Sequence, residues 1–156
     1  MNIDQVVEII QQKWYELQKS NNLNFRDYLN DNWRPKRGQL EFQGVYVIYK
    51  GKEPLYVGSA GKGTHVLKWR ISDMFYCPNA KKNKFYHTLT RKLVGEHLAE
   101  KHGVSHGIEE AVNAVRAFYS TKCSFKAVQA KNMDEARMLE QAFILLLKPR
   151  PKYNSK

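Results

Sequence analysis

Two tyrosines, Tyr46 and Tyr56, stand ten residues apart in two short segments rich in β-branched and aromatic residues. A phenol takes part in proton transfer when its pKa, ordinarily about 10, is brought toward neutrality. Segments 44–50 and 54–58 have the composition of strands, with turn residues between them, so we expect a β-hairpin. A turn centred on residues 51–52 places the tyrosines opposite or diagonal to each other on one face of the sheet. An aromatic pair packed on a core explains the same spacing, and both interpretations stay open.

A carboxylate, Glu140, stands on the apolar stripe of a helix that the sequence predicts over 133–147. A charge on such a face is costly unless it is paired or binds a cation. The pattern is equally compatible with a salt bridge to an arginine, for instance Arg70 or Arg91, and with a metal ligand at a phosphate site.

Other patterns exclude several classes of protein. His97, His102 and His106 are close in sequence, but a zinc site needs three or four ligands and the two cysteines stand elsewhere. No Gly-x-x-x-x-Gly-Lys-Ser/Thr loop occurs, which argues against a P-loop ATPase. The longest apolar run, 142–147, is far shorter than the roughly 20 residues of a membrane span, and the N-terminus lacks the features of a secretory signal. Two cysteines are too few for a disulfide framework, so we expect a reducing, cytoplasmic location and no membrane partner.

The charge of the chain is strongly positive and unevenly distributed. The 156 residues carry a net charge of +11, with a pI near 9.6. Residues 50–101 hold 11 basic and 4 acidic side chains, whereas residues 1–30 hold 3 basic and 4 acidic ones. Clustered Lys and Arg with a pI above about 9 are typical of a protein that binds a polyanion such as nucleic acid. An ordinary basic surface is the alternative.

The elements that must position these residues follow from apolar spacing and turn residues. Helices are expected over 3–19, 25–29, 66–75, 87–101, 108–119 and 133–147, and strands over 44–50, 54–58 and 123–130. This order predicts an α/β (α+β) fold, a small sheet of about three strands with a β-hairpin, flanked by helices. Turn formers over 30–38 indicate a boundary. We therefore expect a helical N-terminal extension, 1–41, packed on a domain of residues 42–156.

Five short motifs in this order resemble the GIY-YIG nuclease family. They are Gly44-Val45-Tyr46, Tyr56-Val57-Gly58, Arg70 on the following helix, Glu140 on a late helix and the closing Pro151-Lys152-Tyr153-Asn154. The stretch 67–75 is similar to the helix after the second motif in the nuclease domain of bacterial excision-repair enzymes. The resemblance covers residues 44–154, most of the chain.

The resemblance implies a phosphodiesterase that depends on Mg²⁺ or Mn²⁺. Tyr46, Tyr56 and Arg70 match catalytic residues of the family, and Glu140 matches its single metal-ligating carboxylate. Gly44, Gly58 and Asn154 match residues that support the site. One carboxylate can hold Mg²⁺, because this ion keeps several waters and takes other ligands from the phosphate. Nearby Lys and Arg charges would lower the pKa of a tyrosine acting as the base, and either tyrosine could fill that role.

Two positions depart from the family pattern. Many members carry a lysine directly after the second motif, where this chain has Ser59, and Lys62 or Lys68 could supply the charge. Some members carry a histidine a few residues past the arginine, and here His87 in the next segment could take that place or play no part. Contacts to DNA are expected from basic residues around the motifs: Lys62, Lys68, Lys81, Lys82, Lys84 and Arg91. A solvated charged loop is an equal alternative for the lysines within 76–85.

The expected function is a divalent-metal-dependent endonuclease acting on double-stranded DNA, of restriction or DNA-processing type. A nucleic-acid-binding module that keeps the fold without cutting is the alternative, and a structural protein with an incidental basic surface is a third interpretation. RNA as substrate is left open. With one active site per chain, a double-strand cut would require a homodimer or two successive nicks.

Overall fold

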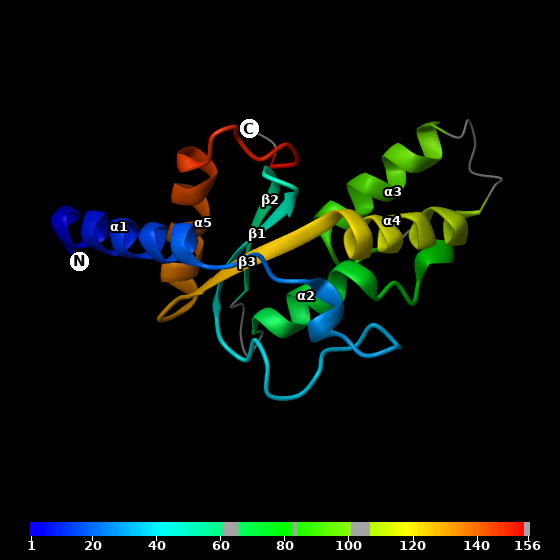
Figure 1. The fold of residues 1–156 in the computed structure, drawn as a ribbon, viewed down its shortest axis with the longest axis horizontal. Helices are drawn as coiled ribbons and strands as arrows, with labels where there is room; N and C mark the ends of the chain where they lie inside the picture. Colours follow the sequence, from blue (N-terminus) through cyan, green and yellow to red (C-terminus); the bar gives the residue numbers. More distant parts are fainter. Residues whose placement is uncertain (61–65, 83, 101–106, 155–156) are drawn as a thin grey trace.

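The computed structural model describes residues 1–60, 66–82, 84–100 and 107–154 (Figure 1). Their strands form one antiparallel sheet, in which β1 (Gly44–Lys50) lies between β2 (Glu53–Ala60) and β3 (Cys123–Gln129). The predicted α+β class, with a hairpin and a three-stranded sheet, is confirmed.

Helices surround the sheet in the predicted order. They are α1 (Ile3–Lys19), η1 (Phe25–Tyr28), α2 (Leu67–Phe75), η2 (Ala80–Lys82), α3 (Thr88–Glu100), α4 (Ile108–Lys122) and α5 (Met133–Leu146), where η marks a 3₁₀ helix. Asn132 caps the start of α5, because its side-chain oxygen accepts a hydrogen bond from the backbone N–H of Glu135. This bond leaves one fewer unpaired donor in the first turn of the helix. The structure differs from the sequence prediction mainly in lengths: α4 continues three residues past its expected end, and β2 begins one residue earlier and ends two residues later than expected. The expected basic loop 76–85 also contains the short helix η2.

The sheet is covered on both faces (Figure 1). Helices α1 and α5 lie on one face, against Val45, Val47 and Val128, whereas α2, α3 and α4 lie on the other, against Tyr46 and Ile48. The central strand is therefore buried on both sides, which explains why it contains an uninterrupted run of apolar residues instead of an alternating pattern.

The N-terminal extension takes part in both cores. Leu17 of α1 is buried on the α5 side, and Phe25 and Leu29 are buried on the opposite side. The backbone of Leu23 exchanges hydrogen bonds of 2.7 and 3.0 Å with Phe125, so the segment after α1 adds to the edge of β3. No helix within the described ranges is long and apolar enough to cross a membrane.

Candidate active site

A one-residue bulge in the hairpin places the two tyrosines on one face. Next to the turn, Tyr49 pairs with Pro54, but after the bulge Ile48 pairs with Tyr56 and Tyr46 with Gly58. An unbroken register from the turn would have set Tyr46 opposite the residue after Tyr56, and the two rings would then point to opposite faces. With the bulge the tyrosines are diagonal neighbours, and their ring centroids are 6.3 Å apart.

Gly58 leaves room for the Tyr46 ring, which lies across β2 at this position. A Cβ added to Gly58 would overlap the hydroxyl of Tyr46 and would stand 2.5 Å from its Cζ. Gly44, at the start of β1, is equally constrained, because an added Cβ would overlap the carbonyl oxygen of Val128. Both glycines of the motifs are therefore required by close contacts.

His87 lies in the site, in direct contact with Tyr46. Its Nε2 is 2.6 Å from the Tyr46 hydroxyl, and the Tyr56 ring packs edge-on to the imidazole with centroids 5.3 Å apart. The backbone N–H of Leu89 donates to Nδ1 over 3.1 Å, so Nδ1 carries no proton and the neutral imidazole must be protonated at Nε2. His87 therefore donates to the phenol oxygen and, through Nδ1, caps the first turn of α3.

Neighbouring cations act on the pKa of the tyrosines in the expected direction, but the net shift is upward. Tyr46 is fully buried and Tyr56 partly buried, and burial raises the pKa of both above its ordinary value. Arg70 acts in the predicted direction, since its charge lowers the pKa of each phenol, but the loss of solvation is larger. Burial also lowers the pKa of His87 well below its ordinary value, and Arg70 adds to this, so the imidazole is neutral at pH 7.

Arg70 reaches the tyrosines from α2. Its Nη1 lies 3.3 Å from Asp73 Oδ2, one turn along the helix, and 3.3 Å from the carbonyl oxygen of Tyr86. These contacts hold the guanidinium on the side of the sheet where the phenols lie. A guanidinium fixed in this way keeps N–H groups that can bind a phosphate in a forked geometry.

Glu140 is close enough to Tyr56 and Tyr46 to act on their pKa, and no described residue pairs with it. Within the described part of the chain its carboxylate makes no hydrogen bond or ion pair, so the alternative of a salt bridge to Arg70 or Arg91 does not occur in this structure. The side chain is partly exposed, and its charge raises the pKa of Tyr56 and, more weakly, of Tyr46.

An unpaired, partly exposed carboxylate fits the expected Mg²⁺ site, in which one protein ligand is joined by waters and phosphate oxygens. No cluster of three or more His, Cys, Asp or Glu side chains suited to a metal occurs among the described residues. A preformed multi-ligand centre is thus absent from that part of the chain, but the single-carboxylate arrangement does not need one.

Asn154 fastens the C-terminal segment to the edge of the sheet. Its Oδ1 accepts the backbone N–H of Val57 over 2.7 Å, and its Nδ2 donates to the Val57 carbonyl over 2.9 Å. The backbone N–H of Tyr153 donates to Leu55, the bulged residue, over 2.8 Å. These bonds satisfy backbone groups at the edge of β2 on either side of Tyr56, at Leu55 and Val57. Asn154 therefore orders the strand that carries this phenol.

The basic residues expected to contact DNA lie in different surroundings. Lys82, Lys84 and Arg91 are exposed, and the charge of Arg91 reaches Tyr56. Lys81 forms an exposed ion pair with Glu109, and Lys68 is engaged by Glu41. Lys62 lies outside the described residues, as do His102 and His106.

Sequence reasoning missed two contributors to the site. Thr88, directly after His87, lines the same cleft as Tyr56 and acts to lower the pKa of its phenol. The Tyr86 carbonyl binds Arg70. Their proximity to His87 is the only sequence signal that could have indicated them.

In comparisons with known proteins, the chain matches no family model, no curated protein and no solved structure. The function is therefore argued from the geometry of the site.

Proposed function

We propose that this protein is a divalent-metal-dependent endonuclease of GIY-YIG type that hydrolyses phosphodiester bonds in DNA. The observation that supports the proposal most is the convergence of Tyr46, Tyr56, His87 and Arg70 on one face of the sheet, with the unpaired carboxylate of Glu140 beside them. Double-stranded DNA is the proposed partner, in keeping with the net charge of +11. The cytoplasm is the proposed location, in keeping with two free cysteines.

In this proposal Arg70 binds the scissile phosphate, and Glu140 would hold the metal ion beside it. The guanidinium binds non-bridging oxygens, where negative charge develops in the transition state. Glu140 would hold Mg²⁺ or Mn²⁺, which, when bound, supplies Lewis-acid stabilisation of the leaving oxygen.

Tyr56 is the phenol placed to meet the attacking water. It is partly exposed and borders a cleft of about 380 Å³ between α3 and α5, whereas Tyr46 is fully buried. The Tyr56 phenolate takes a proton from the water. Because the charge of Glu140 raises the pKa of Tyr56, neutralising that charge lowers it and increases the phenolate fraction. Tyr46, held by His87, is a positioning residue behind Tyr56.

The test compares cleavage and binding of DNA by wild-type protein, Tyr56→Phe and Tyr15→Phe. Tyr15 is 63% exposed on α1 and serves as the matched control. We expect cutting by the wild type with Mg²⁺ and none with EDTA, a loss of about 100-fold or more for Tyr56→Phe with unchanged binding, and no change for Tyr15→Phe. Retention of DNA on a gel without cutting of plasmid or branched substrates would contradict the proposal and favour the non-catalytic binding module.

A further inference from the structure

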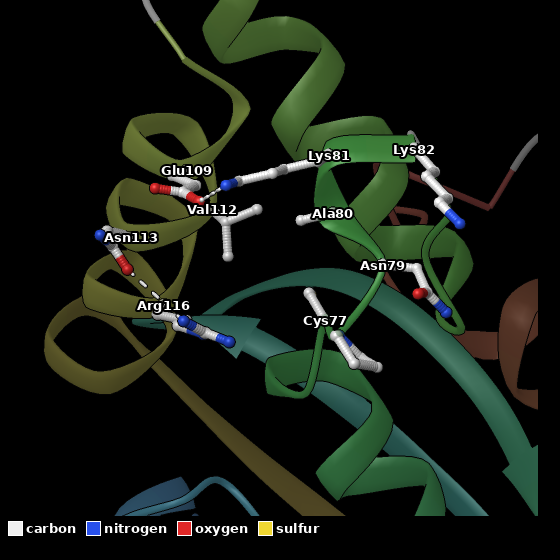
Figure 2. A pocket seen from close by; sticks show the side chains of 10 residues that line it. Cys77, Asn79, Ala80, Lys81, Lys82, Glu109, Val112, Asn113 and Arg116 are labelled. Carbon is white, nitrogen blue, oxygen red and sulfur yellow. Dashed lines mark hydrogen bonds and ion pairs between the residues drawn. The ribbon is translucent and has the colours of Figure 1, made fainter.

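A second basic cavity lies between α4 and the segment that leaves α2. It has a volume of about 580 Å³ (Figure 2). Arg116 and Asn113 of α4 form one wall and Cys77 and Lys81 the other, with the Arg116 guanidinium extending from α4 toward the Cys77 side. None of the sequence motifs includes Arg116.

Arg116 is held in place before any ligand binds. Its Nε donates to the carbonyl oxygen of Phe75 over 2.8 Å, and the guanidinium lies 5.1 Å from the centre of the Trp33 ring. The Trp33 ring is itself fixed by stacking on Phe75, with centroids 5.1 Å apart and planes at 11°. A cation stacked on an indole and bound to a backbone carbonyl keeps its other N–H groups in a fixed direction, which favours recognition of an anion.

The described lining of the cavity carries more positive than negative charge, because Lys81, Lys82 and Arg116 stand against the single carboxylate of Glu109. Arg116 is partly buried and has no carboxylate within ion-pair distance in the described part of the chain. Lys81 pairs with Glu109 over 3.3 Å, but the two side chains are 82% and 68% exposed, so this pair is weak and Lys81 can turn to an anionic ligand.

The cavity is connected to the candidate active site by two elements. Phe75, whose carbonyl binds Arg116, is five residues along α2 from Arg70, roughly 7.5 Å along the helix axis. The segment that lines the cavity at residues 77–82 continues to Tyr86 and His87, which contact Arg70 and Tyr46. The cavity and the candidate active site are therefore joined through α2 and through the segment that follows it.

We propose that this cavity is a second phosphate subsite, in which Arg116 and Lys81 bind a backbone phosphate of the nucleic acid outside the scissile position. The inference rests on the proposed function and extends it, because it assigns a part of the substrate to α4. Each phosphate neutralised by a protein cation releases counterions, so the subsite must contribute to the salt dependence of binding.

The experiment measures the affinity for duplex DNA in EDTA over a range of KCl concentrations. We expect Lys81→Gln and Arg116→Gln each to reduce the slope of log K against log salt by about 0.9 and to weaken binding about tenfold at moderate salt. Arg116→Lys keeps the charge and the slope but loses the forked geometry, with binding weakened about threefold. The control is Lys52→Gln, an exposed lysine in the β1–β2 turn, which should leave slope and affinity unchanged.

Each other outcome overturns the inference. Equal slopes for wild type and all variants would show that the cavity takes no DNA phosphate. If inorganic pyrophosphate raises the melting temperature of the wild type but not of Arg116→Gln, while the DNA slopes stay equal, the cavity serves a free phosphate ligand. Absence of DNA binding by every protein would remove the proposed function itself. If Arg116→Gln does not fold, Lys81→Gln decides, because its side chain is largely exposed.

Discussion

Replacing Gly58 with alanine tests the link between the packing of the hairpin and the site. The added methyl group would overlap the Tyr46 hydroxyl and stand 2.5 Å from Cζ, about 1 Å closer than carbon atoms approach in contact. The ring can move only at the cost of its packing and of its bond to His87, because Tyr46 is fully buried and its hydroxyl lies 2.6 Å from His87 Nε2. The substitution must therefore move the ring or spread β1 and β2 apart.

The expected cost follows from these contacts. Forcing an extra carbon into a packed interior costs about 1–3 kcal/mol. Loss of the buried Tyr46–His87 hydrogen bond adds about 1–3 kcal/mol, because both groups stay buried without a partner. Gly58→Ala should therefore lower the free energy of unfolding by about 2–6 kcal/mol. By displacing the phenols by about 1 Å, it should also reduce cleavage about 100-fold.

The assay is urea unfolding followed by tryptophan fluorescence, with cleavage measured on the same preparations. Gly95→Ala is the matched control, because Gly95 stands inside α3 and a Cβ there meets nothing within 4 Å. The control should raise stability by about 0.5–1 kcal/mol, since alanine loses less entropy in a helix than glycine. A Gly58→Ala protein as stable and as active as the wild type would refute the packing argument.

Three further outcomes are expected. Asn154→Ala removes both bonds to Val57 and should lower the free energy of unfolding, measured with urea, by about 1–3 kcal/mol. A variant as stable as the wild type would show that the C-terminal segment does not hold β2. Burial lowers the pKa of His87, so protonation favours the unfolded state. The contribution of the neutral imidazole to the free energy of unfolding is complete above the ordinary histidine pKa of about 6.5. As pH falls below that value, this contribution is lost by up to about 1.4 kcal/mol per pH unit. His87→Gln should remove that acid dependence, and an unchanged pH profile of unfolding would contradict burial of a neutral imidazole. Glu140→Gln should lower the pKa of Tyr56, measured by the ultraviolet absorbance of tyrosinate during alkaline titration, and an unchanged titration would place Glu140 away from the phenol.

Local signals in the sequence were sufficient for the elements and for the motif positions on them. The spacing of apolar residues gave the correct bounds of α1 and the correct first residue of α5. Gly51, between the two expected strands, indicated the turn of the hairpin. In the structure Gly51 has a φ of +60°, a conformation that favours glycine.

Contacts distant in sequence explain what the sequence did not reveal. The carbonyl of Leu55 at the bulge accepts the backbone N–H of Tyr153, almost 100 residues later, and no local pattern indicates this contact. The position of His87 depends on how the preceding segment turns back toward β1. The direction of the tyrosine pKa shifts depends on burial, which the charge pattern does not report. Glu140 was expected to be a costly charge on an apolar face, but its side chain is partly exposed.

Cleavage of supercoiled plasmid by wild type, Glu140→Gln and Glu8→Gln, each with Mg²⁺ or EDTA, tests the nuclease proposal most directly. Glu8 is an exposed carboxylate on α1, so its replacement changes the net charge equally without touching the site. The account predicts nicked or linear products from wild type and Glu8→Gln with Mg²⁺ only, and cutting lowered at least about 100-fold in Glu140→Gln while DNA is still bound. Equal cutting by Glu140→Gln, or cutting that persists in EDTA, would contradict it.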